Sequence, residues 1–344
     1  MSKLFFPNNR KLLTILICLQ LFLIMGLRDA YSVGVDMGRY AIHYSTLSEI
    51  QLFEAPFYDN GSSALYYLAN AVFSKIGISF QLFISCVSAF IVGIVGRYVY
   101  KYSDDVVLSF ALYLGMGAYT FAFSGIRQAI AMAIILLCVE QFFNKNYYRT
   151  YIYLILAVLF HTTAIIILPF LLISKIKISN LVILFYFVIG IFFVVFRIQI
   201  GQFITLVYQE SYIGRYRSMG QLGGTALFLL ILLVFYFYTN SRQIRTAGSK
   251  ESRFFHSLVI SFLLQSMASF AYTFTRLNLF YMQTFLTLIF PESLHKNKLN
   301  KRFGRIYNLI RIIIYIVFIV IMINQFYGYI SGEQLDDYIF FWER

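Results

Sequence analysis

The sequence predicts an all-α polytopic membrane protein with about nine to eleven transmembrane helices. Of its 344 residues, 60% are hydrophobic and only 12% are charged, whereas soluble domains carry about 25% charged residues. Apolar runs of about 20 residues recur along the chain, and each is long enough to cross a bilayer as a helix. The short alternating segments of an outer-membrane barrel are not visible, so we exclude that class.

The apolar runs give the predicted elements in chain order. The candidate spans are 12–27, 80–99, 105–123, 128–143, 151–173, 181–197, 223–239, 254–272, 277–290 and 306–327. The stretch 62–78 is shorter and more polar, which favours a re-entrant or interfacial helix. We expect a single integral membrane domain over 1–344, with one larger external loop at 198–222.

Basic residues set the predicted orientation, because lysine and arginine collect in cytoplasmic loops. The N-terminus and the basic loops 240–253 and 291–305 are therefore predicted to be cytoplasmic. The loop 28–61 carries five acids against two arginines and is predicted to be external, as is 198–222. Three spans separate the basic residues Lys145 and Arg149 from the loop at 240. An odd number cannot return the chain to the same side, so the sequence leaves this part of the topology open.

The net charge of +13 reflects this topology rather than a nucleic-acid partner. No basic run carries the interleaved aromatic residues that stacking on bases requires, so we exclude nucleic acid. The sequence also has no Gly-rich phosphate loop, no His/Cys metal cluster and no Gly-x-Ser-x-Gly motif. We therefore expect neither a cofactor nor a metal.

Arg127 is the first candidate site residue, because ionisable groups at membrane depth are costly and often functional. It lies near the centre of the run 106–143. A single helix of that length would be about 57 Å long, too long for one crossing. The chain must therefore turn at "FSGIRQ", with Ser124 and Gly125 as breakers. Arg127 and Gln128 would then begin a helix, where free N–H groups favour anions; the alternative is an arginine that snorkels to headgroups.

Arg276 repeats this arrangement inside the nearly uncharged run 254–290. Two lone arginines on one face of the membrane can bind a pyrophosphate or carboxylate through paired hydrogen bonds. His161 lies in "LFHTTAIIILP". It could make an ordinary interhelical hydrogen bond, transfer a proton or contact a substrate.

The loop 198–222 carries Arg215 and Arg217 among several tyrosines. If the loop is external, its basic character suits an anionic or saccharide ligand. A simple solvated loop is an equal alternative.

Three motifs occur in this order along the chain: "GLRDAYSVGVDMGRY", "FSGIRQAIAMAI" and "LFHTTAIIILP". With this spacing the chain resembles the EpsG family of bacterial polysaccharide polymerases, the Wzy-like group, over residues 10–295. Met37 stands where the family often has threonine. The matching positions are Arg28, Gly34, Asp36, Tyr40, Arg127, Gln128, His161, Thr162 and Arg276.

The resemblance implies a metal-independent glycosyltransferase in the bacterial inner membrane. It would join oligosaccharide repeat units, carried on undecaprenyl pyrophosphate, at the outer face of that membrane. The product could be capsule, O antigen or exopolysaccharide. The expected partners are the lipid-linked oligosaccharide and the bilayer, and a protein that regulates chain length is a candidate partner.

The resemblance also suggests roles for the site residues. Arg28, Arg127 and Arg276 would stabilise the charge that develops on the departing pyrophosphate. Asp36 or His161 would take or orient the proton of the attacking hydroxyl. The remaining predicted substrate contacts are Gln128, Arg215, Arg217 and Tyr40.

Two other functions remain open at this point. A flippase or exporter of lipid-linked oligosaccharides would bind pyrophosphate with the same arginines. Many transporters contain inverted repeats, which are not visible here. A non-catalytic scaffold of an assembly complex is the third hypothesis, and it leaves the isolated arginines unexplained.

Overall fold

The computed structural model describes a helical chain. It covers residues 9–59, 62–200, 223–268, 272–294, 309–310, 312–325, 327–328 and 338–344. Within these ranges the secondary structure consists of helices, with an isolated β-bridge between Arg28 and Phe340. The contacts divide the chain into two compact units: Met1–Ile165 with Asn324–Arg344, and Ile166–Ile323. We describe each unit by itself.

Apolar helices confirm the predicted all-α membrane class. Among the described residues, three helices are long and apolar enough to cross a membrane. They are α5 (Phe80–Tyr102), α8 (Ile126–Phe143) and α13 (Gly224–Ile244). Shorter apolar segments occur at Val106–Gly115, Tyr147–Phe160, Thr162–Ile173, Asn180–Val195 and Ile312–Gln325.

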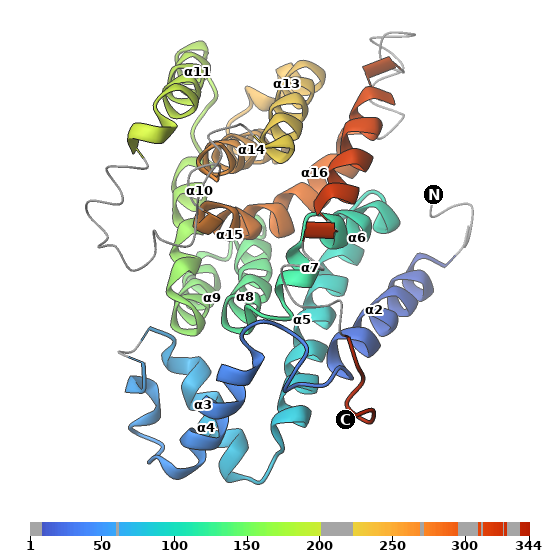
Figure 1. Ribbon diagram of the computed structural model, residues 1–344. Helices are drawn as coiled ribbons and strands as arrows, with labels where there is room; N and C mark the ends of the chain where they lie inside the picture. Colours follow the sequence, from blue (N-terminus) through green and yellow to red (C-terminus); the bar gives the residue numbers. More distant parts are fainter. Residues whose placement is uncertain are drawn as a thin grey trace. The chain divides into compact units, whose positions relative to one another are not determined.

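The first unit is built around α8. Helix α2 (Arg10–Gly26) packs against α5, and α8 lies between α5 and α9 (Tyr147–Phe160) (Figure 1). Side chains of Asn9, Ser79 and Asn146 accept hydrogen bonds at the starts of α2, α5 and α9, which satisfies free N–H groups there. In α8, 78% of the residues are buried. A helix that is apolar on all sides is expected at such a central place.

The segment after α2 forms shorter helices: α3 (Met37–Glu49), η1 (Ala55–Phe57) and α4 (Ala64–Lys75). Helices α3 and α4 pack against each other, and α4 also contacts α9 and α5 (Figure 1). The predicted re-entrant or interfacial stretch 62–78 is thus mainly α4. With 12 residues, α4 is too short to cross a bilayer.

The chain breaks before α8 at the predicted Gly125, but an earlier break at Gly115 and Gly117 shows that the expected continuous span over 105–123 is wrong. Helix α6 (Val106–Gly115) ends at Gly115, and Gly117 adopts a positive φ of 79° before the four-residue α7 (Ala118–Phe121). Gly125 then occupies the N-cap of α8. The predicted turn at "FSGIRQ" is therefore confirmed, and Arg127 lies in the first turn of α8.

The expected continuous span over 151–173 is wrong. Helix α9 ends at Phe160, and His161 has extended φ and ψ angles of −160° and 118°. A 3₁₀ segment, η2 (Thr162–Ile167), and a short helix, α10 (Leu168–Ile173), follow. His161 therefore lies at a break between helices rather than within one helix.

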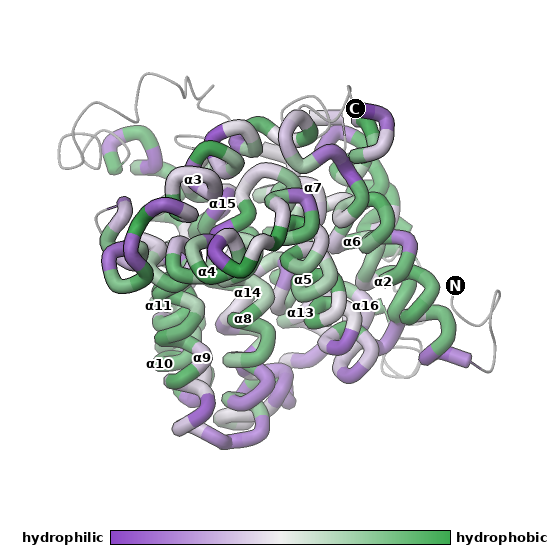
Figure 2. The backbone as a smooth tube through the Cα atoms, turned by 90° about the horizontal axis from the view of Figure 1, so that it is seen from below, coloured by the Kyte–Doolittle hydropathy of each residue, from purple (hydrophilic) through white to green (hydrophobic). Residues whose placement is uncertain are grey.

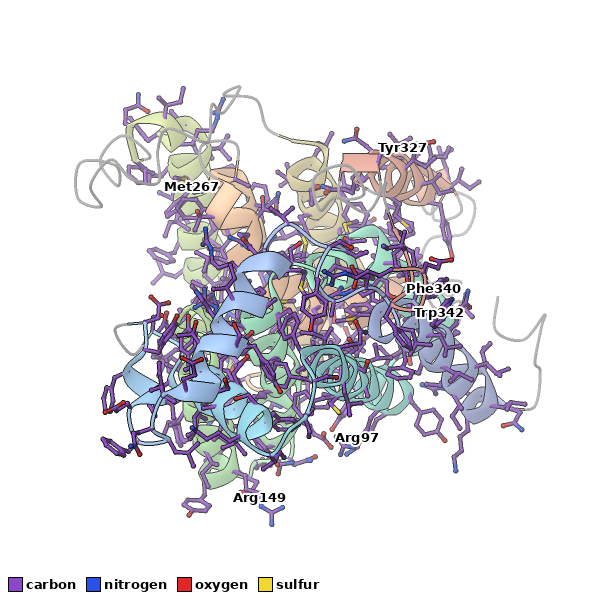
Figure 3. The ribbon with its side chains drawn as sticks, turned by 60° about the horizontal axis from the view of Figure 1, so that its bottom comes forward. Arg97, Arg149, Met267, Tyr327, Phe340 and Trp342 are labelled. Atoms are coloured by element: carbon purple, nitrogen blue, oxygen red, sulfur yellow. The ribbon has the colours of Figure 1, made fainter. Side chains whose placement is uncertain are left out.

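Charged side chains gather at the far end of α8 from Arg127. The Glu140 carboxylate is 3% exposed, and both Arg97 and Lys101 of α5 bind it, with the Lys101 Nζ at 2.7 Å. The chain leaves α8 near this end and turns into α9, where Arg149 points away from the helices (Figure 3). Figure 2 shows hydrophilic residues at this closed end of the α8–α9 hairpin and hydrophobic residues along the two helices.

The second unit has α14 (Lys250–Met267) at its centre, in contact with α11 (Asn180–Val195), α13 and α15 (Tyr272–Tyr281). A π-helical turn, η4 (Met282–Leu286), joins α15 to α16 (Thr287–Ser293). Buried Asn278 links α15 to α14 because it accepts a hydrogen bond from Ser261 and donates one to Gln265. These bonds satisfy polar groups that would otherwise be costly to bury.

Two predicted loops extend beyond the described residues. The structure describes the loop 198–222 only to residue 200 and the loop 291–305 only to residue 294. Arg215 and Arg217 therefore lie outside the described residues, and their predicted roles stay predictions.

Candidate active site

Arg127 lies in a small polar network at the start of α8. Its Nη1 donates a hydrogen bond to the Tyr67 hydroxyl at 2.8 Å and lies 3.2 Å from Asp59 Oδ2. The Tyr67 hydroxyl donates to the same Asp59 oxygen at 2.9 Å. The guanidinium also lies 5.8 Å from the centre of the Tyr40 ring and 5.7 Å from that of Tyr67. The arginine side chain remains 22% exposed, so a ligand can reach it.

The acid of this network stays charged. Partial burial alone would raise the pKa of Asp59, but hydrogen bonds from Tyr67, Ser62 and Arg127 outweigh that effect and lower it. At neutral pH the network therefore pairs a carboxylate with a guanidinium. Aromatic faces on a cation and charge-assisted hydrogen bonds both fix the position of the arginine.

His43 lies beside the network on α3. Its ring centre is 5.3 Å from that of Tyr58 and 5.9 Å from that of Tyr67. Burial and the nearby Arg127 cation lower the pKa of His43, against a smaller opposing effect of Asp59. The imidazole is thus neutral at pH 7. Its buried Nδ1 has no hydrogen-bond partner among the described residues.

Sequence reasoning missed Asp59, Tyr67 and His43. In the sequence, Asp59 is only one of the five acids that predict an external loop at 28–61. His43 and Tyr67 belong to two different short helices, α3 and α4, in which aromatic residues usually serve packing. No local sequence pattern indicates that these three residues lie beside the start of α8.

Helix α3 connects two predicted site residues with Arg127. Asp36 is the N-cap of α3, and its carbonyl accepts a hydrogen bond from the Tyr40 N–H at 3.1 Å. Residues four apart lie on one face of a helix, so Asp36 is one turn from the ring that faces the guanidinium. Asp36 is partly exposed, and its carboxylate makes no hydrogen bond or ion pair to any described residue.

The loop before α3 is joined to the turn before α8. The Val35 N–H donates to the Ser124 Oγ at 2.9 Å. Gly34 has a φ of 119°, and a Cβ atom there would lie 2.4 Å from the Phe123 carbonyl oxygen. Only glycine fits such a close approach. The first and second sequence motifs therefore meet in space.

Arg28 is part of this junction but is fully buried. Its guanidinium lies 4.4 Å from the centre of the Phe123 ring, and its Nη2 lies 3.6 Å from the sulfur of Met37. A buried cation against an aromatic face stabilises the packing of the loop. This placement favours a structural role for Arg28, and its predicted pyrophosphate contact stays a prediction.

The C-terminal residues 338–344 pair with the same loop. The Asp29 N–H donates to the Ile339 carbonyl at 2.9 Å, and the Phe341 N–H donates to the Leu27 carbonyl at 3.1 Å. Figure 3 shows Phe340 and Trp342 side by side, and their rings stack at 4.5 Å. The tail and the start of the loop 28–61 thus lie at the same end of this unit.

The α8–α9 hairpin brings His161 to the Arg127 end. A three-residue turn joins α8 and α9, and the two helices pack along each other. Arg127 lies at the start of α8, and His161 directly follows α9. In a helical hairpin these two positions occupy the same end. His161 is partly exposed there.

The other predicted residues are distributed differently. Gln128 follows Arg127 and is 5% exposed. Arg276 lies on α15 of the second unit and is partly exposed. Its predicted cooperation with Arg127 stays a prediction.

This fold and site define a polytopic helical membrane protein with a partly exposed arginine at the start of a deeply buried helix. A family model gives the affiliation: the EpsG family matches residues 11–335, nearly the whole chain. The chain belongs to the EpsG family, the Wzy-like polymerase family, which supports a polysaccharide polymerase-type role in general. No curated protein and no solved structure matches the chain.

Proposed function

We propose that this chain joins oligosaccharide repeat units, carried on undecaprenyl pyrophosphate, at the outer face of the bacterial inner membrane. The placement of Arg127 carries the proposal. It is partly exposed, fixed by Asp59 and two tyrosine rings, and located at a helix N-terminus. Helix N-termini and arginine forks both favour phosphate oxygens.

The reaction transfers a glycan from one lipid carrier to the sugar end of another. A hydroxyl oxygen of the incoming unit forms a bond to the anomeric carbon of the growing chain. The bond from that carbon to the pyrophosphate oxygen breaks, and its electron pair leaves with the lipid pyrophosphate. The hydroxyl proton passes to a base. Negative charge therefore grows on the pyrophosphate as the bond breaks.

Arg127 is suited to stabilise this growing charge. A guanidinium has five N–H donors. The contacts to Asp59 and Tyr67 both use Nη1, which leaves further donors for a phosphate oxygen. Because Asp59 and the tyrosine rings hold the cation in place, little reorganisation is needed when the charge develops. In this proposal Gln128 and Tyr40 contact the substrate, and the predicted role of Arg276 stays a prediction.

Two residues are candidates for the base. Asp36 lies one helical turn from Tyr40, is partly exposed, and is not engaged by any described cation. His161 lies at the same end of the unit. The base must come within hydrogen-bond distance of the hydroxyl, and the proposal assigns this role to one of these two residues.

An assay with purified protein tests the proposed reaction. Protein in liposomes is mixed with a short lipid-linked repeat unit, and product length is measured on a gel. Longer glycans that form without an energy source, and in the presence of a chelator, support the metal-independent polymerase. Transport of the unit without lengthening would instead indicate a flippase, and neither activity would indicate a scaffold.

A further inference from the structure

A groove of about 490 Å³ runs along the surface of the first unit between α2 and α5. The start of α2 meets the end of α5, because Arg10 Nη2 donates to the Tyr100 and Ser103 carbonyls at 2.7 and 2.6 Å. The two helices are therefore antiparallel. The volume lies within the usual range for ligand sites, about 300–1,000 Å³.

Small residues of α5 create the groove. At Gly96 the helices touch closely, since a Cβ atom there would lie 2.2 Å from the Cys18 sulfur. At Gly93, one turn earlier, a Cβ atom would meet nothing within 4 Å. The walls are apolar on the α2 side, where Ile15 and Leu19 are about half exposed, at 51% and 49%. The missing side chain at position 93 thus opens a trough between two apolar walls.

Cations mark one end of this trough. Lys11 of α2 and Arg97 of α5 both line it, and no acid does. Arg97 shares the Glu140 carboxylate with Lys101, so two cations face one anion there. Beyond the end of α5, the Asp105 carboxylate accepts a hydrogen bond from the Leu108 N–H, which caps α6. The trough is therefore apolar along its length and positive at one end.

We propose that this groove binds an anionic phospholipid. One acyl chain lies in the trough over Gly93, and the phosphate contacts Lys11 and Arg97. The charge pattern favours an anionic lipid over an uncharged apolar chain, because only the anionic lipid carries a group that the two cations can bind. The basic end is also the one that the lysine and arginine distribution predicts to be cytoplasmic, where anionic lipids concentrate.

Lipid retention by the purified full chain tests the site. Native mass spectrometry would compare dioleoyl phosphatidylglycerol with dioleoyl phosphatidylcholine, which has the same chains and no net charge. We expect preferential retention of phosphatidylglycerol. Lys11→Gln should weaken it about fivefold, as expected for the loss of one cation near an anionic headgroup, while Lys11→Arg should preserve it.

Groove-filling variants test where the acyl chain lies. Gly93→Phe should reduce retention at least fivefold because the ring occupies the trough, whereas Gly93→Ala should retain the lipid. Arg149→Gln is the matched charge control, because Arg149 is exposed on α9 outside the groove. Added inorganic phosphate should not displace the lipid, because the chain contributes to binding.

Three outcomes would overturn the proposal. Equal retention of phosphatidylglycerol and phosphatidylcholine would show that the headgroup charge does not contribute to binding. If Gly93→Phe retains as much lipid as the parent, the acyl chain does not lie in this groove. If Arg149→Gln loses as much lipid retention as Lys11→Gln, anionic lipids are attracted to the basic surface in general and not to this groove. None of these outcomes bears on the polymerase assay, so the two proposals fail independently.

Discussion

Arg127 Nη1 lies 3.2 Å from Asp59 Oδ2, although 68 positions separate the two residues in the chain. This ion pair ties the start of α8 to the loop that follows η1. The guanidinium is held in this position only when the loop packs over the start of α8. The geometry of the proposed phosphate contact therefore depends on a long-range contact of the loop 28–61.

Replacement of Arg127 should reduce polymer formation strongly. We expect Arg127→Ala to lower the rate about 10²- to 10³-fold, as for the loss of one donor that stabilises developing charge. Arg127→Lys should recover only part of the rate, because an ammonium lacks the planar fork. The measurement is initial polymer formation in liposomes with equal protein content. Arg149→Ala serves as the control, and a normal rate in Arg127→Ala would exclude a catalytic role.

Tyr67→Phe should weaken the same function by a smaller amount. The variant retains the ring and removes the hydroxyl that binds both Arg127 and Asp59. Hydrogen bonds to charged groups contribute about 1.5–3 kcal/mol, so we expect a loss of roughly ten- to a hundredfold. Tyr58→Phe is the matched control, because the Tyr58 ring packs against that of Tyr67 and its hydroxyl binds no described residue. Similar rates in the two variants would show that the hydroxyl network does not position Arg127.

The sequence predicts local features of this site well. The run 106–143 is too long for one crossing, and Ser124 and Gly125 are the breakers within it. That argument correctly places Arg127 at a helix start. Helix length and breaker residues act within a few positions, so they can be inferred from the sequence alone.

Features that depend on distant contacts could not be predicted. The pairing of Asp59 with Arg127 has no local signal, because Asp59 lies in a loop 68 positions before Arg127 in the sequence. The break at His161 lies eight positions before Pro169, so proline does not mark it. Charged residues are usually exposed, which gave no reason to expect that Arg28 is completely buried. Tertiary packing decides these three features.

His43 should make the protein less stable at mildly acidic pH. Burial and Arg127 lower its pKa below the ordinary value of about 6.5 that it has when unfolded. As the pH falls below 6.5, the unfolded chain binds the proton first, so the free energy of unfolding decreases. Asp59 does not contribute in this window, because its pKa is lowered from an already acidic value. His43→Gln should therefore lose less stability than the parent between pH 7.5 and 5.5.

Thermal unfolding in detergent measures this difference. As the pH falls from 7.5 to 5.5, the midpoint of the parent should decrease more than that of His43→Gln, so the difference between the two midpoints should change. A constant gap across the range would contradict the assignment. His256→Gln is a poor control because His256 binds Tyr186 and the Ile176 carbonyl, so the parent at pH 7.5 provides the reference.

Removal of residues 338–344 should loosen the start of the loop 28–61. The segment makes two backbone hydrogen bonds to Leu27 and Asp29, and the Tyr338 hydroxyl donates to the Ile24 carbonyl at 2.6 Å. At about 1 kcal/mol each, their loss should lower the free energy of unfolding by about 2–3 kcal/mol. Arg344→Ala should change it by less than about 1 kcal/mol, because the ion pair with Asp29 is long and its arginine is 55% exposed.

The single tryptophan of the chain offers a second measurement of this contact. Trp342 stacks on Phe340, whose backbone bridges to Arg28. In Tyr338→Phe, which removes one anchoring hydrogen bond, the segment should detach more often and acrylamide should quench Trp342 more strongly. Unchanged quenching, together with unchanged stability of the truncated chain, would mean that the segment does not hold the loop. Because Arg28 and Val35 join that loop to the turn before α8, a loosened loop should also lower polymer formation, but less than Arg127→Ala does.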